Sequence, residues 1–514
     1  MGSLSFDTSS ASVCIALGVA AFVFYKLATR RRSLPFPPGP KGWPIIGNLY
    51  DFPNQDQARK FRALSEAYGD IMHFNVFGMH AVVLNKPEHA KALMETRSSI
   101  YSDRTGSTMF ELVGWYEWSS TIFQYGAQWR AHRRIMHQAL LPSALEKFED
   151  VQMRSTATML RDLLEDPDRF VEHITMAFAT TAMRIAYGLD LPSMEESDKN
   201  RHINGLRSIL TTGTEILVPG KYIVDFFPPL RHLPDWMPGA GFKRTAADIK
   251  KEVNAVLVNV YERGKLETDK QSIVNEEVSK IASTTLTRDE LAEAERKIWG
   301  VTGTLYTAGA ETTESAVEGL FLALAMHPDI QKRAQAEIDA VVGRLRLPTL
   351  ADRPSLPYID ALLRELLRWH VIVPTGIPHT ATRDDEYAGY RIPKGALVIA
   401  NIWAYTRDPK SSRTRGAQAR RFLRDGEFHV DPAADPYDWV FGFGRRICPG
   451  RHLADRTLFL SFASILHAFT VTPGVDAAGH RASSRRGSRR ARSLGGRPLE
   501  FGCEIKPRWD GAPT

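Results

Sequence analysis

A glycine-rich segment near the end of the chain places one cysteine where it could bind a metal. The segment, residues 441–450, reads Phe-Gly-Phe-Gly-Arg-Arg-Ile-Cys-Pro-Gly. Its glycines allow backbone conformations that a side chain would block, so the loop can pass close to a flat or bulky group. A helical run follows Cys448, and the amide groups and dipole at its start favour the thiolate, the form that ligates metals. The alternative for this spacing alone is a small apolar cysteine in a turn.

A long helix is predicted over residues 287–326, with polar side chains in its middle. It starts with the capping box Thr-Arg-Asp-Glu and would be on the order of 55–60 Å long. Residues 308–313 read Ala-Gly-Ala-Glu-Thr-Thr; Gly309 permits close approach, and a threonine hydroxyl can bond back to the previous turn and bend the helix. Glu311 and Thr312 would then present a carboxylate and a hydroxyl to a pocket, which suits proton delivery. The alternative is a polar surface cluster.

Two further pairs have helical spacing. Glu365 and Arg368 lie three residues apart and therefore share a helix face. Trp129 and Arg133 lie four residues apart in a second helical segment. Taken singly, the first pair is equally typical of a solvated ion pair, and the second of a core tryptophan beside a surface arginine.

The remaining pattern predicts helices with small sheets. Residues 57–68 favour a short helix, and the alternating runs 71–77 and 81–84 favour two paired strands. After Pro87 the pattern is helical for about 270 residues. Residues 387–401 return to a strand-turn-strand pattern. We therefore expect a mainly α fold in which one long central helix crosses the molecule.

Composition excludes several classes of function. The 514 residues contain three cysteines, too few for a disulfide framework, and neither the CxxC nor the HExxH zinc pattern occurs. The net charge of +7 equals the contribution of seven arginines in one stretch, so the rest of the chain is balanced and gives no evidence for a nucleic-acid partner. These arginines are Arg481, Arg485, Arg486, Arg489, Arg490, Arg492 and Arg497.

The first 42 residues are predicted to attach the protein to a membrane. We expect a short lumenal segment (1–10), a transmembrane anchor (11–28) and a basic, proline-rich hinge (29–42) before a catalytic domain over 43–514. The positive charges follow the apolar run, which predicts an uncleaved anchor with a cytosolic catalytic domain. The expected location is the endoplasmic reticulum membrane, spanned once.

In this order, the motifs resemble those of the cytochrome P-450 superfamily, the haem-thiolate monooxygenases. The resemblance covers about nine-tenths of the chain and is strongest to fungal microsomal members of the O-methylsterigmatocystin oxidoreductase-like group. It implies a triangular helical body with the long central helix over a haem. Cys448 would be the axial ligand of the haem iron, Glu311 and Thr312 the catalytic proton-delivering pair, and Ala308 and Gly309 the oxygen groove. The implied haem-binding residues are Trp129, Arg133, His379, Phe441, Gly444, Arg446, Cys448 and Gly450. The implied structural set is Glu365, Arg368 and Arg421.

The resemblance also implies an activity and partners. The cofactor would be haem b, with electrons from NADPH through NADPH-cytochrome P-450 reductase and with cytochrome b5 as an optional second donor. The substrate would be a small hydrophobic molecule of fungal secondary or xenobiotic metabolism, and aromatic residues between 109 and 123 either roof its pocket or pack in the core. Two alternatives remain: a haem-thiolate isomerase or dehydratase, and an inactive membrane-anchored haem or ligand binder.

Two tracts depart from the family pattern. Residues 411–421 are rich in Ser and Arg where relatives have proline and acid, although Arg421 and Phe422 keep the end of the motif. Residues 482–497 form an Arg/Ser tract where relatives have a strand hairpin. Each tract is either a reading-frame error in a GC-rich gene or a genuine basic insertion.

Overall fold

The computed structural model describes residues 34–218, 221–408, 416–432, 434–474, 498 and 501–509. The predicted anchor, the first hinge residues, positions 411–415 and the tract 482–497 lie outside these ranges. Within them, no helix combines the length and the hydropathy needed to cross a membrane.

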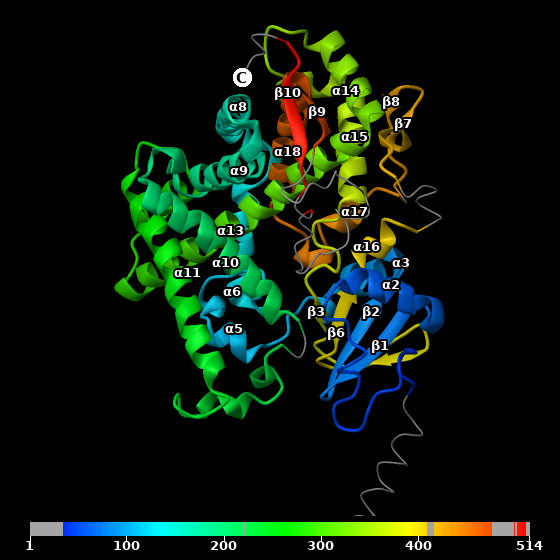
Figure 1. The fold of residues 1–514 in the computed structure, drawn as a ribbon. Coiled ribbons are helices and arrows are strands. Elements are labelled where there is room, and N and C mark those ends of the chain that lie inside the picture. Colours follow the sequence, from blue (N-terminus) through cyan, green and yellow to red (C-terminus); the bar gives the residue numbers. More distant parts are fainter. Residues whose placement is uncertain are drawn as a thin grey trace, which may run out of the picture.

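Helices make up most of the described chain (Figure 1). The longer ones are α2 (Gln57–Tyr68), α6 (Ala127–Ala139), α8 (Glu149–Glu165), α9 (Phe170–Tyr187), α10 (Glu196–Ile216), α11 (Gly241–Leu266), α12 (Ile273–Ala282), α13 (Arg288–Met326), α14 (Pro328–Val341), α15 (Pro357–Trp369) and α18 (Arg451–Ala468). The short ones are α3 (Pro87–Ala90), α4 (Ser98–Tyr101), α5 (Thr108–Leu112), α7 (Pro142–Leu145), α16 (Ile402–Tyr405) and α17 (Tyr437–Val440). The predicted helix over 57–68 is confirmed as α2.

The predicted long helix is confirmed as α13, which has 39 residues and passes through the middle of the molecule (Figure 1). Its capping box is present, because Thr287 accepts a hydrogen bond from the Glu290 backbone and the Glu290 carboxylate accepts one from the Thr287 backbone. The helix ends at Met326, and Pro328 then starts α14.

Four small sheets accompany the helices. The largest has the order β1-β2-β6-β3, with β2 and β6 parallel and its other neighbours antiparallel. The β1–β2 hairpin confirms the two predicted strands, and the predicted strand-turn-strand region contains β5 and β6. The strands are β1 (Ile71–Val76), β2 (Met79–Leu84), β3 (His379–Thr380), β4 (Asp385–Tyr387), β5 (Tyr390–Ile392), β6 (Leu397–Ala400), β7 (Leu423–Arg424), β8 (Glu427–Phe428), β9 (Phe469–Pro473) and β10 (Cys503–Pro507).

The core follows α13. Its carboxyl-terminal half packs with α8, α9, α15 and α18 in one apolar cluster, and its amino-terminal half contributes to a second cluster with α9, α10 and α11. Nearly every residue of α13 from Ile298 to Ala325 is buried, which explains why a polar segment in its middle stands out. The fold is therefore mainly helical with small sheets, as predicted.

Candidate functional site

The cysteine loop is held by backbone contacts that require its glycines. Gly444 has a φ of +54°, and a Cβ atom there would lie 2.1 Å from the Met94 carbonyl oxygen, so glycine is needed. The Cys448 amide donates to the Phe441 carbonyl at 2.7 Å, which closes the loop. A Cβ atom at Gly450 would lie 3.8 Å from the Cys448 sulfur. Helix α18 starts at Arg451, as predicted.

The effect of the helix start on Cys448 is weaker than the sequence suggested. Burial raises the pKa of the Cys448 thiol, while the Gly450 amide, Arg133 and Arg451 oppose that shift without reversing it. The amide at the start of α18 acts in the predicted direction, but desolvation outweighs it together with the two cations. A bound metal cation would supply the missing stabilisation of the thiolate.

Arg446 belongs to this loop, and its side chain contacts residues that precede α6. Its Nε donates to the Ser102 carbonyl at 2.7 Å and its Nη2 to the Phe123 carbonyl at 2.7 Å. Its Nη1 is buried and has no hydrogen-bond partner among the described residues. The guanidinium also stacks on Trp129, with 4.6 Å between its carbon and the ring centroid. Burial lowers the pKa of Arg446 to about 10.

Sequence reasoning missed a second buried arginine, Arg104. Its side chain donates to three backbone carbonyls, those of Thr121 at 3.1 Å, Ile377 at 2.9 Å and Pro378 at 2.7 Å. Burial and the nearby Arg446 hold its pKa well below the usual value. Arg104 lies in a loop without periodicity, so no sequence pattern marks it.

His379 and Arg133 are the remaining predicted haem-binding residues of this region. His379 lies in β3, and its Nδ1 donates to the Tyr101 carbonyl at 2.6 Å. Burial and Arg104 hold its pKa well below the usual value, so the ring is neutral and its Nε2 is an acceptor. A carboxylate placed at Nε2 would favour the protonated ring. Arg133, one helical turn after Trp129 in α6, is partly buried, and burial lowers its pKa.

The charges in this region are unbalanced in a way that fits an anionic ligand. Arg104 and Arg446 lie near one acid, Asp103, and Arg133 lies near Arg446. Asp103 is already engaged, since its Oδ1 accepts from the backbone amides of Arg104 and Tyr125. Buried cations are costly unless paired, so the site would be stabilised by a negative group such as the propionates of haem. The residues present therefore fit that cofactor.

The polar segment of α13 is accessible on an otherwise buried helix. Thr312 is exposed and Ala308, Gly309 and Glu311 are partly exposed, whereas the residues on either side are mostly buried. The Thr312 hydroxyl donates to the Ala308 carbonyl at 2.8 Å, which confirms the predicted back-bond. Helix α13 continues through this segment without a break.

The predicted structural set comes together in the core. Arg368 donates two hydrogen bonds of 2.7 Å to the Glu365 carboxylate, and Arg421 donates a third at 3.1 Å. The Gln418 amide also donates to Glu365 at 2.7 Å. Glu365 is 0% exposed. Arg421 therefore keeps its place although Ala419 and the residue after it replace the proline and acid of relatives.

Three apolar residues of the segment 109–123 lie in the core. Met109, Phe110 and Trp115 are buried in the cluster shared with α10 and α11, and Trp115 packs against Gly213 of α10. This placement supports the core-packing interpretation of these three side chains.

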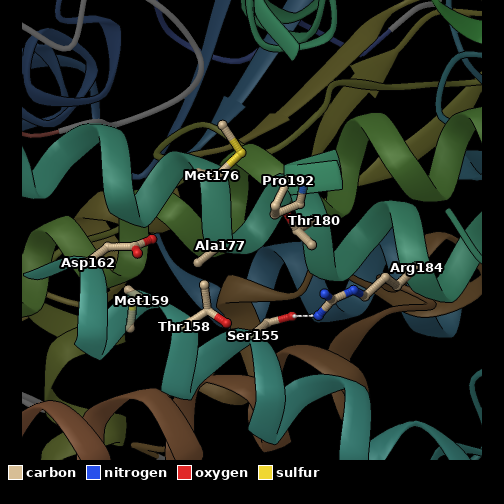
Figure 2. Close-up of a pocket in the computed structure, with 9 residues that line it drawn as sticks. All are labelled: Ser155, Thr158, Met159, Asp162, Met176, Ala177, Thr180, Arg184 and Pro192. Atoms are coloured by element: carbon tan, nitrogen blue, oxygen red, sulfur yellow. Dashed lines mark hydrogen bonds between the residues drawn. The ribbon is translucent and has the colours of Figure 1, made fainter. Parts of the chain in front are cut away.

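A small pocket between α8 and α9 contains none of the predicted site residues (Figure 2). Arg184 donates to Ser155 at its edge at 3.2 Å, and the buried Thr180 hydroxyl has no described partner. Its lining is Ser155, Thr158, Met159, Asp162, Met176, Ala177, Thr180, Arg184 and Pro192.

Comparison with known proteins agrees with the motifs. The family model described as "Cytochrome P450" matches residues 37–480. Cytochrome P450 monooxygenase COX2 of Coprinopsis cinerea is 36% identical over 97% of this chain and 93% of its own length. Cytochrome P450 monooxygenase COX1 of the same fungus is 37% identical over 92% of this chain and 93% of its own length. Cytochrome P450 monooxygenase 208 of Postia placenta is 35% identical over 98% of this chain and 96% of its own length. The chain therefore belongs to the cytochrome P450 family and is an oxidoreductase of its monooxygenase type.

Proposed function

We propose that this protein uses haem b, dioxygen and electrons from NADPH to hydroxylate or otherwise oxidise a small hydrophobic substrate in fungal secondary or xenobiotic metabolism. The observation that carries the proposal is the buried Nη1 of Arg446. This nitrogen has no described partner, and the Arg446 side chain lies near the cationic side chains of Arg104 and Arg133. An unpaired buried donor in a cationic region favours an anionic cofactor over a water-filled or apolar site.

Each part of the site has a role in this proposal. Cys448 would ligate the haem iron, and Phe441, whose carbonyl receives the Cys448 amide, would shield the sulfur. Arg446, Trp129 and Arg104 would hold the propionates, with His379 and Arg133 beside them. Haem ligated by thiolate supplies the binding of dioxygen and the electron donation that favours cleavage of the O–O bond.

The α13 segment would handle protons. The Thr312 hydroxyl already donates to the Ala308 carbonyl, so its oxygen lone pairs remain able to accept a hydrogen bond from a water molecule. Glu311 on the preceding position is partly exposed and provides a carboxylate for proton exchange with that water. The small side chains of Ala308 and Gly309 leave room for dioxygen against the helix.

The test is the spectrum of the full-length, haem-loaded protein. The wild type should show the red-shifted band of a thiolate-ligated haem when reduced and exposed to carbon monoxide, and Cys448→Ser should lack it. Oxygen consumption that depends on NADPH, reductase and an apolar compound separates a monooxygenase from an isomerase or dehydratase. A wild type without the band, or turnover independent of NADPH, would contradict the proposal.

We also propose that the flavoprotein reductase docks on the cysteine side. Arg134 and Arg445 are exposed there, and Arg445 donates to Tyr125 at 2.7 Å. Basic residues steer an acidic partner, so Arg134→Glu with Arg445→Glu should slow haem reduction at low salt. Equal reduction rates for the double variant and the wild type would exclude this surface.

Membrane attachment is the third proposal. Large apolar side chains are exposed in two stretches, at Trp43, Ile45 and Tyr50 near the predicted anchor and at Phe227 and Trp236 between α10 and α11. Such side chains are favourable at a lipid interface. The full chain should float with lipid vesicles, and a chain starting at residue 34 should float less. Equal flotation of the two would contradict an anchoring role for the first 33 residues.

A further inference from the structure

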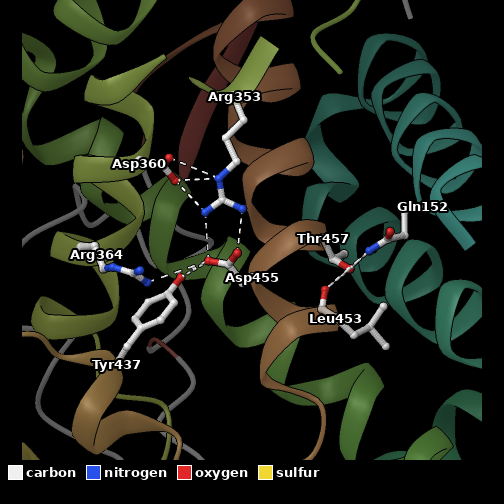
Figure 3. Close-up of polar contacts among 8 residues, drawn as sticks. All are labelled: Gln152, Arg353, Asp360, Arg364, Tyr437, Leu453, Asp455 and Thr457. Carbon is white, nitrogen blue, oxygen red and sulfur yellow. Dashed lines mark hydrogen bonds and ion pairs between the residues drawn. The ribbon is translucent and has the colours of Figure 1, made fainter. Parts of the chain in front are cut away.

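A cluster of charged side chains joins α15, α17 and α18 outside the site described so far (Figure 3). At its centre is Arg353, in the short 3₁₀ helix Leu350–Ser355. Its guanidinium donates to both Asp360 oxygens, with a shortest distance of 2.7 Å, and to both Asp455 oxygens at 2.6 and 3.0 Å. One arginine therefore ties the first turn of α15 to the first turns of α18.

Tyr437 extends the cluster to α17. Its hydroxyl donates to Asp455 Oδ1 at 2.6 Å. The Arg364 guanidinium of α15 covers its ring, with 3.1 Å from the guanidinium carbon to the ring centroid, and lies 3.9 Å from Asp455. The Tyr437 side chain is thus fixed from its edge by a carboxylate and from its face by a cation.

The Asp455 carboxylate is ionised in this environment. Burial raises its pKa, but the hydrogen bonds and charges of Arg353, Tyr437 and Arg364 outweigh burial and keep the pKa below the ordinary value. The same carboxylate and its burial hold the pKa of Tyr437 well above the usual range, so the phenol stays a donor. The cluster therefore keeps one arrangement of donors and acceptors near neutral pH.

The cluster reaches the cysteine loop through a ring contact on one side and through the backbone of α18 on the other. Tyr437 packs edge to face on Phe441, with 5.1 Å between ring centroids and an interplanar angle of 82°. The Phe441 carbonyl in turn accepts the Cys448 amide at 2.7 Å. On the other side of the loop, Asp455 lies in α18 five residues after Gly450. Both ends of the loop are thereby held against α15.

We propose that Asp455 and Tyr437 are positioning residues that set the place of the Cys448 sulfur and the polarity around it. The inference rests on the proposed function, because it assumes that Cys448 ligates haem iron. Groups that hydrogen-bond directly to a metal ligand orient it and are worth about 10–100-fold in affinity or activity, and Asp455 and Tyr437 lie one contact further out, so we expect effects near the lower end of that range. Asp455 acts through Arg353 on α15 and through Tyr437 on Phe441, without touching the sulfur itself.

The test uses the full-length, haem-loaded protein with Asp455→Asn and Tyr437→Phe. Both variants keep the side-chain shape and remove one charge or one hydroxyl. We expect the reduced, carbon monoxide-bound protein to lose its thiolate band about tenfold faster in Asp455→Asn, with a smaller acceleration in Tyr437→Phe. The reduction potential of the iron should shift in both variants, and Asp455→Glu, which restores the carboxylate, should recover part of the band lifetime.

Asp339→Asn is the matched control. Asp339 of α14 forms a two-bond ion pair with Arg508, at 2.9 and 2.6 Å, and Arg508 contacts the far end of α18. The control breaks an ion pair of the same chemistry at the end of α18 far from the cysteine loop, so it should leave the band lifetime and potential unchanged. Circular dichroism confirms that each variant is folded.

The outcomes separate the two proposals. If the wild type shows the band and both variants have the same band lifetime and reduction potential as the wild type, the positioning role is overturned. The proposed function would then remain intact. An equal change in Asp339→Asn would also overturn it, since the effect would then be general destabilisation. A wild type without any thiolate band would overturn both proposals.

Discussion

The cysteine loop and the polar segment of α13 are stabilised in different ways. The loop is constrained from several sides: Gly444 lies against the Met94 carbonyl, Phe441 accepts the Cys448 amide, and Arg446 bonds two carbonyls of the preceding chain. The α13 segment is accessible, and the Thr312 hydroxyl bonds only within its own helix in the contacts described. The two proposed roles, metal ligand and proton donor, would need these opposite environments.

The difference has a physical basis in the two tasks. A metal ligand must stay within a few tenths of an ångström of one position, so its surroundings are fixed by many weak contacts. A proton-relaying hydroxyl must exchange partners, so additional bonds to neighbouring elements would hinder it. Substitutions on the cysteine side should therefore change stability, and those on the α13 side should change turnover.

The largest loss of stability is expected for Glu365→Gln. Its carboxylate is fully buried and accepts from Arg368, Arg421 and the Gln418 amide. Removing this charge takes a buried anionic partner away from two arginines, which costs about 3–5 kcal/mol. Denaturant unfolding should show this loss, and Glu504→Gln, in an exposed pair with Lys506, should change stability by less than about 1 kcal/mol.

Thr312→Ala should separate the two regions most clearly. Without the hydroxyl, proton delivery weakens and the product formed per NADPH consumed falls about 100-fold. Stability should change by less than about 0.5 kcal/mol, because the side chain is exposed. Thr313→Ala, which removes a hydroxyl bonded to the Gly309 carbonyl, is the control, and an equal fall in coupling there would contradict a specific role for Thr312.

Gly444→Ala tests how tightly the loop is built. The new Cβ atom would overlap the Met94 carbonyl at a positive φ, so we expect a loss of about 2 kcal/mol or more and weaker haem retention. Gly426 also has a positive φ, of 88°, but has no neighbour within 4 Å of an added Cβ atom. Gly426→Ala should therefore cost about 1 kcal/mol and leave haem retention unchanged. Equal effects at both sites would argue against a close-packed loop.

The smallest effect concerns pH and a histidine outside both regions. Burial lowers the pKa of His202 to about 4, so between pH 6.5 and 4 the unfolded chain binds a proton there and the folded chain does not. Stability is therefore lost as the pH falls through this window. The drop in unfolding free energy from pH 7 to pH 5 should be about 1–2 kcal/mol smaller in His202→Phe. Identical pH dependence in variant and wild type would contradict this.

Local patterns predicted the elements well, and contacts between distant residues less well. The α13 bounds followed from a capping box and a following His-Pro, both of which act within one turn. Arg104 and the Arg353–Asp455 pair carry no local signal, because their partners lie far away in sequence. The net pKa shift of the Cys448 thiol was not predicted for a related reason: the sequence shows the helix start, but burial depends on the whole fold.

The Arg368 side chain forms hydrogen bonds on both sides of the segment 407–415, which contains the start of the first tract that departs from the family pattern. It donates to the Thr406 carbonyl at 2.9 Å and to the Gly416 carbonyl at 3.1 Å. The chain between these two anchors behaves thermodynamically as a closed loop, whose entropy cost grows only with the logarithm of its length, by about 0.6 kcal/mol for each doubling. Lengthening the chain between Thr406 and Gly416 would therefore add little entropic cost, and the two carbonyls would still hold Arg368 beside Glu365.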